Sequence, residues 1–118
     1  MARRVDLAMD TLAMIVLIGG TGDVDNRLVS LLLDHTAASV LVVSRRGRAS
    51  DDRVKTLRLN IAATDAAARI PLGATVVNLT EATPPSVAAD VVRAGGNFLE
   101  TSASPDYVEL IIQEVSAN

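Results

Sequence analysis

A glycine-rich loop is the short motif most suggestive of chemistry. Residues 19–25 read Gly-Gly-Thr-Gly-Asp-Val-Asp, between the apolar run 13–18 and apolar residues at helical spacing. Glycines permit a tight strand-to-helix turn and close approach of a pyrophosphate, and free amides at the helix start bind the anion. The predicted contacts to a dinucleotide's phosphates are Gly19, Gly20, Thr21, Gly22, Asp23 and Val24. The alternative is a turn that needs glycine for its own conformation.

Asp25 departs from this fingerprint, because it stands where the third glycine of Gly-x-Gly-x-x-Gly is usual. Its side chain adds bulk between helix and strand. Asp23 and Asp25 each repel a phosphate by on the order of 1 kcal/mol in a wet site. The same acids suit the positive end of the helix dipole. We predict that Asp25→Gly strengthens dinucleotide affinity; equal affinity of the two proteins would exclude Asp25 from binding.

A basic segment follows the second predicted strand. Six of the 11 basic residues lie in 45–58, and no acid occupies the first positions after the strand. In dinucleotide folds an acid there binds the ribose 2′-hydroxyl, whereas arginine accommodates a 2′-phosphate. We predict that Ser44, Arg45 and Arg46 bind the adenosine half and favour NADP over NAD. The alternative is a solvated basic loop that pairs with the acids at 51–52.

Polar residues also end the later strands. Asn78 and Thr80 follow the fourth predicted strand, where open α/β sheets place ligands. We expect them to contact a nicotinamide ribose, or alternatively to satisfy the polar groups of a turn. Thr101 and Ser102 end the fifth strand, with the same two interpretations. His35 lies in the last turn of a helix, where a cation favours the dipole, and receives no catalytic role.

The sequence predicts no catalytic residue and no metal site. There is no Cys and a single His, which excludes thiolate chemistry, disulfides and a multi-His site. Ile111 stands four residues after Tyr107, so the tyrosine–lysine pair of short-chain dehydrogenases is absent. Tyr107 is expected to pack the final helix.

The composition indicates one aliphatic domain spanning 1–118. Apolar residues make up 49% of the 118 and aromatic residues only 2%. A net charge of −3 and the lack of aromatic platforms argue against a nucleic-acid partner. The longest clean apolar run, 12–18, is too short to span a membrane. Asp6 and Asp10 interrupt a signal-like start, so we expect a cytoplasmic protein without a membrane partner.

Hydrophobic periodicity predicts strands and helices in alternation. The strands are expected at 13–18, 40–43, 54–61, 74–79 and 97–101, and the helices at 23–35, 64–70, 84–94 and 105–115. Residues 1–13 form an N-terminal extension with helical spacing, and 45–53 a loop or single helical turn. Alternation of this kind predicts a doubly wound, five-stranded parallel sheet, Rossmann-like, in a three-layer α/β/α arrangement.

Particular residues are expected to face the core or to cap these helices. The predicted apolar faces are Val24, Leu28, Leu31 and Leu32 in the first helix, Val87, Val91 and Val92 in the third, and Val108, Ile111, Ile112 and Val115 in the last. Thr83 and Ser104 each precede a proline, a pattern typical of a helix cap followed by proline at the first helical position.

Several of these segments resemble one family. The similarity is to the start of saccharopine dehydrogenase-like proteins and spans about 14–110. It is carried by residues 18–24, 74–78, 91–95, 98–102 and 105–108. The resemblance implies an NAD(P)-binding Rossmann-like domain of an oxidoreductase. In that family a second, larger domain supplies substrate contacts and catalytic groups. Asp25 and Glu100 depart from the family's usual glycine and aspartate.

The sequence therefore predicts the NADP-binding domain of a saccharopine dehydrogenase-like oxidoreductase, without the substrate domain and inactive alone. Its expected partners are the dinucleotide and either a missing second domain or a second copy of the chain. The alternative is a non-enzymatic nucleotide-sensing or oligomerisation module with a degenerate cofactor site. Exposed apolar surface on the N-terminal segment or the final helix would favour that alternative.

Overall fold

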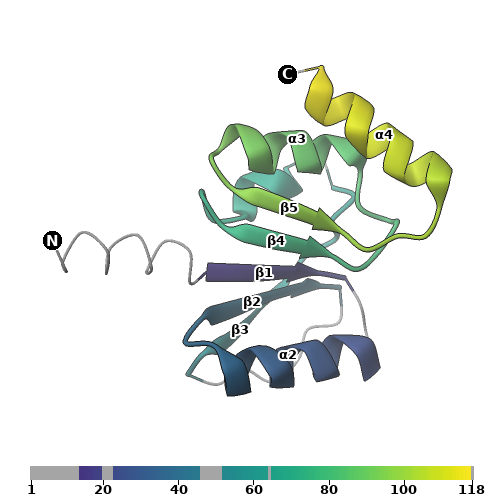
Figure 1. The fold of residues 1–118 in the computed structure, drawn as a ribbon. Coiled ribbons are helices and arrows are strands. Elements are labelled where there is room, and N and C mark those ends of the chain that lie inside the picture. The colour runs from purple at the N-terminus through teal and green to yellow at the C-terminus, as the bar shows by residue number, and fades with distance from the viewer. Residues whose placement is uncertain (1–13, 20–22, 46–51, 64, 118) are drawn as a thin grey trace, which may run out of the picture.

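The computed structural model describes residues 14–19, 23–45, 52–63 and 65–117. Strands and helices alternate along the chain (Figure 1). The strands are β1 (Met14–Ile18), β2 (Ser39–Ser44), β3 (Val54–Arg58), β4 (Thr75–Asn78) and β5 (Asn97–Glu100). The helices are α2 (Asp23–His35), α3 (Pro85–Arg93) and α4 (Pro105–Ser116), with a short 3₁₀ helix, η1 (Ala66–Arg69).

The five strands form one parallel sheet in the order β3-β2-β1-β4-β5. From β1 the chain adds β2 and β3 on one side, then crosses back to place β4 and β5 on the other. The strand order therefore reverses between β1 and β4, as in Rossmann folds. This confirms the predicted doubly wound, five-stranded parallel sheet.

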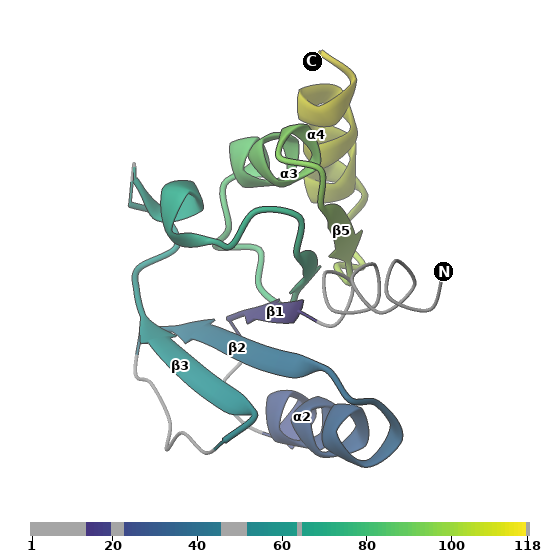
Figure 2. The ribbon, with the colours of Figure 1, turned by 90° about the vertical axis from the view of Figure 1, so that its left-hand side faces the viewer.

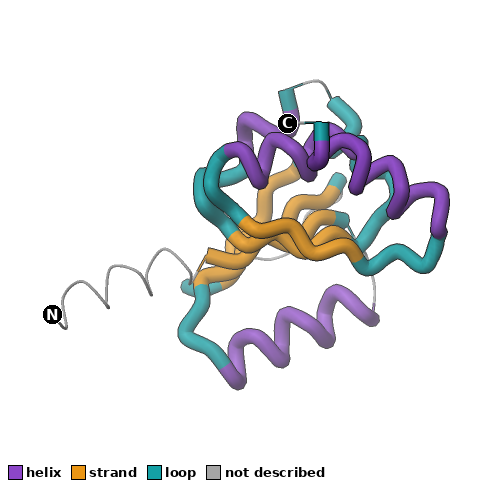
Figure 3. Tube along the Cα trace, turned by 45° about the horizontal axis from the view of Figure 1, so that its top comes forward, coloured by secondary structure: helices purple, strands orange, loops and turns teal. Residues whose placement is uncertain are grey.

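Helices cover both faces of the sheet and make three layers. Helix α2 lies on one face, and η1, α3 and α4 lie on the other (Figures 1 and 3). Figure 2 shows α3 and α4 together on the β5 side of the sheet, with α2 beneath β2 and β3. The α2 face is covered mainly over β1 to β3.

Aliphatic side chains fill the space between these layers. Alternate residues of β1 point to opposite faces, so Val16 and Ile18 pack with α3 and η1 while Leu17 packs with Val29 of α2. A strand buried on both faces needs apolar residues throughout. This explains why β1 and residues 40–43 of β2 are uninterrupted apolar runs rather than alternating ones.

The predicted apolar helix faces are partly wrong. Leu31 in α2, Val92 in α3 and Ile112 in α4 are exposed, whereas Val29, which the predicted face of α2 omits, is buried. Tyr107 is buried, as expected. Consecutive helical residues lie about 100° apart around the axis, so a face displaced by one residue exchanges a buried side chain for an exposed one. In each helix two neighbouring residues in the chain are both apolar, and periodicity alone does not tell which of the two faces the core.

The end of one predicted strand and the type of one predicted helix also need correction. Strand β3 stops at Arg58 rather than at residue 61, because a turn follows in which the side chain of Asn60 accepts from the amide of Ala62 at 3.0 Å. The predicted helix at 64–70 is the 3₁₀ helix η1 within the described residues. The chain therefore leaves the sheet after Arg58, three residues before the end predicted from the alternation of apolar and polar residues.

The two predicted caps have different outcomes. Ser104 accepts a hydrogen bond from the amide of Tyr107 at 3.3 Å, which confirms the cap of α4. Helix α3 instead begins at Pro85, with Pro84 at the cap position and no side-chain cap. Thr83 is one residue too early to cap the helix, and its hydroxyl bonds elsewhere. The expected helix within 1–13 lies outside the described residues, as does 46–51.

No helix in the described part of the chain has the length and apolarity needed to cross a membrane.

Candidate functional site at the carboxyl edge of the sheet

The register of the strands brings their carboxyl ends to one edge. Ile18 at the end of β1 lies between Val43 of β2 and Asn78 of β4. Asn78 in turn lies beside Glu100, the last residue of β5. The segments that follow these strands therefore meet along the same edge, on both sides of the point where the strand order reverses. Ligands of open α/β folds bind in this position.

A cleft of about 770 Å³ opens at that edge, beside β1, β2 and the segments after β3 and β4. Four of the predicted site residues line it together: Gly19, Ser44, Arg45 and Thr80. Leu59, Asn60, Ala62 and Ala82 complete much of its wall. Its size suits a small-molecule site. Sequence reasoning missed Asn60, because β3 was predicted to continue through it.

Gly19 is required at its position for two reasons. Its φ is +74°, in the left-handed region that favours glycine. An added Cβ would overlap the methyl group of Thr80 and lie 2.7 Å from the Cβ of Thr80. The amide of Gly19 donates to the carbonyl of Val43 at 2.8 Å. Gly19 is thus hydrogen-bonded to β2 and closely approached by Thr80, which follows β4.

The end of β2 places a cation beside the cleft. Ser44 is buried, and its carbonyl accepts from the amide of Leu59 at 3.0 Å. Arg45, the next residue, is exposed and lines the cleft. An arginine leaving the second strand at this edge can pair with an anion in the cleft. Ser44 supplies wall and backbone rather than an exposed side chain.

The remaining predicted phosphate-binding residues cannot be placed by their side chains. Gly20, Thr21, Gly22 and Arg46 lie outside the described residues. Helix α2 begins at Asp23, directly after the glycine-rich loop, but the side chains of residues 23–25 are not described. Their contacts to a cofactor, and the effect of Asp25, stay predictions.

Asn78 occupies a structural position. Its side chain is 0% exposed. Its Nδ2 donates to Oε1 of Glu100 at 2.7 Å and to the hydroxyl of Tyr107 at 3.0 Å, while Oδ1 accepts from the hydroxyl of Thr83 at 2.7 Å. Both amide hydrogens are donated within the fold, and complete burial keeps the oxygen, which accepts from Thr83, away from a ligand. Of its two interpretations, the structure favours the structural one.

Tyr107 completes this buried network. Its hydroxyl donates to the carbonyl of Thr83 at 2.6 Å. Burial raises the pKa of Tyr107; the hydrogen bond from Asn78 lowers it, and the charges of Glu100 and Glu81 raise it further. The ring packs with Ala88 and Ile111, as expected for the final helix. The network ties α4 to the loop before α3.

A second cleft, of about 430 Å³, lies beyond Thr80 on the β5 side. Its described lining is Leu79, Thr80, Glu81, Glu100, Thr101, Ser102 and Ala103. Ser102 donates to Glu81 through its hydroxyl and to Glu100 through its amide, both at 2.8 Å. The hydroxyl of Thr101 donates to the carbonyl of Asn78 at 2.7 Å. Thr80 lines both clefts, so they are adjacent.

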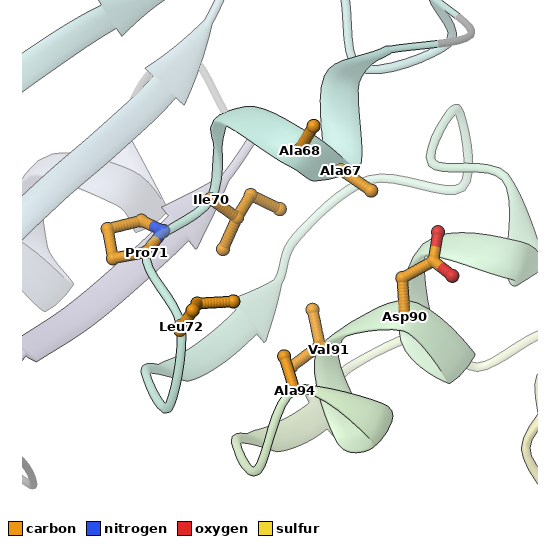
Figure 4. Close-up of a pocket in the computed structure, with 8 residues that line it drawn as sticks. All are labelled: Ala67, Ala68, Ile70, Pro71, Leu72, Asp90, Val91 and Ala94. Carbon is orange, nitrogen blue, oxygen red and sulfur yellow. The ribbon is translucent and has the colours of Figure 1, made fainter.

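A third hollow, of about 240 Å³, lies away from this edge, between η1 and α3 (Figure 4). Its walls are mainly alanine and aliphatic side chains, including Ile70 and Val91. Its one described acid, Asp90, forms an ion pair with Arg93. This hollow therefore offers little that could orient a polar ligand, and the carboxyl edge is the candidate site.

The described residues include no group of three or more His, Asp or Glu side chains placed to hold a metal ion. None of three comparisons, with family models, with curated proteins and with solved structures, gives a match for this chain.

Proposed function

We propose that this chain binds NADP at the carboxyl edge of its sheet, as the cofactor domain of an oxidoreductase of the saccharopine dehydrogenase type. The proposal assigns cofactor binding to these residues and no chemical step. The pyrophosphate would lie at the glycine-rich loop before α2, and the adenosine half in the cleft beside β2.

The coincidence of Gly19, Arg45 and Thr80 around one cleft is the observation that carries this proposal. They come from different segments, after β1, β2 and β4, and meet where the strand order reverses. A positive-φ glycine directly after β1 is typical of the tight turn that opens dinucleotide-binding loops; the amide of Gly19 itself donates to Val43, so a phosphate would use the amides that follow it. An exposed arginine after β2 supports recognition of a 2′-phosphate over a free 2′-hydroxyl.

Calorimetric titration with NADPH, NADH and ATP tests the proposal. We expect NADPH to bind most tightly, because NADH and ATP lack the 2′-phosphate that Arg45 would contact. Arg45→Ala should weaken NADPH by on the order of tenfold, as expected for loss of one charged contact, and leave NADH nearly unchanged. Arg69→Ala on η1 is the matched control, because it removes the same charge from a residue that lines neither edge cleft.

Two results would contradict the proposal. Absence of heat and of chemical-shift change at millimolar NADPH would exclude a cofactor site. Equal loss of NADPH affinity in Arg45→Ala and Arg69→Ala would reduce the effect to net charge.

A second candidate function, oligomerisation, is favoured by the surface of α4. Leu110 and Ile112 are 49% and 52% exposed on this helix. These two side chains lie about 200° apart around the helix, on either side of the buried Ile111, so a partner that covered both would have to wrap around this helix. Sedimentation equilibrium should then show a dimer that Ile112→Lys dissociates. A monomer across the micromolar range in the unaltered protein would exclude this function.

A further inference from the structure

The second cleft differs in charge from the first. Its described lining holds two carboxylates, Glu81 and Glu100, and no basic side chain. The first cleft has Arg45 and no acid in its described lining. A ligand that lies along the edge thus meets a cation on the β2 side and anions on the β5 side. The two sides meet at Thr80.

Hydrogen bonds hold both carboxylates as acceptors. Oε1 of Glu100 accepts from Asn78, its Oε2 accepts from the amide of Ser102, and Oε2 of Glu81 accepts from the hydroxyl of Ser102. Three donors therefore point at these carboxylate oxygens and fix where they lie. The two carboxylates also lie near the same group, since the negative charge of each raises the pKa of Tyr107. The β5 side of the edge therefore carries fixed negative charge.

The proposed function determines which half of the cofactor meets this charge. A dinucleotide crosses the edge where the strand order reverses. With its adenosine half beside β2 and its pyrophosphate at the loop after β1, its other half extends over β4 and β5. That half is the nicotinamide nucleotide. Its ring carries a positive charge when oxidised and none when reduced.

We infer that Glu81 and Glu100 make this site select the oxidised form of the cofactor over the reduced form. This inference rests on the proposed function and deepens it. At the high effective dielectric of a solvent-exposed edge, an opposite charge within about 4–6 Å changes affinity by a few fold, and two such carboxylates change it by on the order of tenfold. Because Glu81 is exposed, salt should reduce the preference as it screens the pair.

The test compares the dissociation constants of oxidised and reduced NADP in three proteins. The unaltered chain should bind the oxidised form on the order of tenfold more tightly. Glu81→Gln keeps the side-chain shape and should lower that ratio severalfold. Glu109→Gln on α4, an exposed acid hydrogen-bonded to Gln113 and outside both clefts, should leave the ratio unchanged. Adenosine 2′,5′-bisphosphate, which has no nicotinamide, should bind all three proteins equally.

The outcomes separate this inference from the proposed function. Binding of both forms with equal affinity, or a ratio that Glu81→Gln leaves unchanged, would overturn the inference while the cofactor site stands. Binding of neither form would overturn the proposed function and the inference with it. A weaker bisphosphate in Glu81→Gln would show that the glutamate acts on the fold rather than on the ring.

Discussion

Replacing Gly19 by alanine should destabilise the protein through two separable effects. The left-handed conformation, with φ of +74°, costs a residue with a Cβ about 1–2 kcal/mol. Overlap of the new Cβ with Thr80 adds about 1–3 kcal/mol, the usual cost of overpacking. Gly19→Ala should therefore lower the free energy of unfolding by about 2–5 kcal/mol, a large part of the 5–15 kcal/mol typical of a domain.

Two further variants divide this loss into its parts. Gly95 also has a positive φ, +86°, but an added Cβ there would meet nothing within 4 Å. Gly95→Ala should thus show the backbone cost alone, about 1–2 kcal/mol. Thr80→Gly removes the atoms that overlap, so it should restore about 1–3 kcal/mol when combined with Gly19→Ala.

Urea denaturation followed by far-ultraviolet circular dichroism measures the free energy of unfolding of the unaltered protein, of the three single variants and of the double variant. Thr80→Gly alone is needed as a reference, because it removes the hydroxyl that accepts from the amide of Ala82. If Gly19→Ala costs no more than Gly95→Ala, the close approach of Gly19 and Thr80 is refuted. If the double variant shows no coupling, Thr80 is not the neighbour that limits residue 19. A fully unfolded Gly19→Ala would still give the coupling through recovery of folding in the double variant.

Two other properties of the fold are testable. Tyr107 is the only tyrosine and there is no tryptophan, so tyrosinate absorbance should report a native pKa above 10.0; a normal value in the folded protein would contradict the buried network. Since the unfolded chain then loses its proton first, the free energy of unfolding should fall as pH rises above about 10. Arg53 donates to the carbonyl of Leu33 in the last turn of α2 and to those of Thr36 and Ala38 just after it, so Arg53→Lys should cost about 1–3 kcal/mol in urea denaturation. Arg69→Lys is the control, and an equally small loss in both variants would show that the guanidinium contacts contribute little.

The sheet was predictable because its central strands are continuous apolar segments, which can be recognised without a periodic pattern. Runs such as 13–18 are short, apolar without interruption and followed by glycine, which is typical of a strand buried on both faces. The parallel, doubly wound arrangement then followed from alternation with helices. Helix faces were less predictable: Leu31 and Leu32 are chemically alike, and packing against β1 to β3, not periodicity, buries one face and exposes the other.

The candidate site was predictable where function depends on backbone position. Gly19, Arg45 and Thr80 follow strand ends, and strand ends of a parallel sheet gather at one edge. Asn78 shows the limit of that reasoning, because it also ends a strand but points into the layer with Thr83 and Tyr107. Which face a terminal residue takes depends on register. The pairing of Glu81 and Ser102, 21 residues apart, has no local signal in the sequence.

The central claim is that a dinucleotide lies across the carboxyl edge, and amide chemical-shift mapping during titration with NADPH tests it most directly. The account predicts progressive shifts at Gly19, Arg45 and Thr80, which line one cleft from three different segments. Ala68 and Ala94, beside the hollow between η1 and α3, should stay unchanged. Shifts confined to that hollow, or none at millimolar NADPH, would contradict the claim.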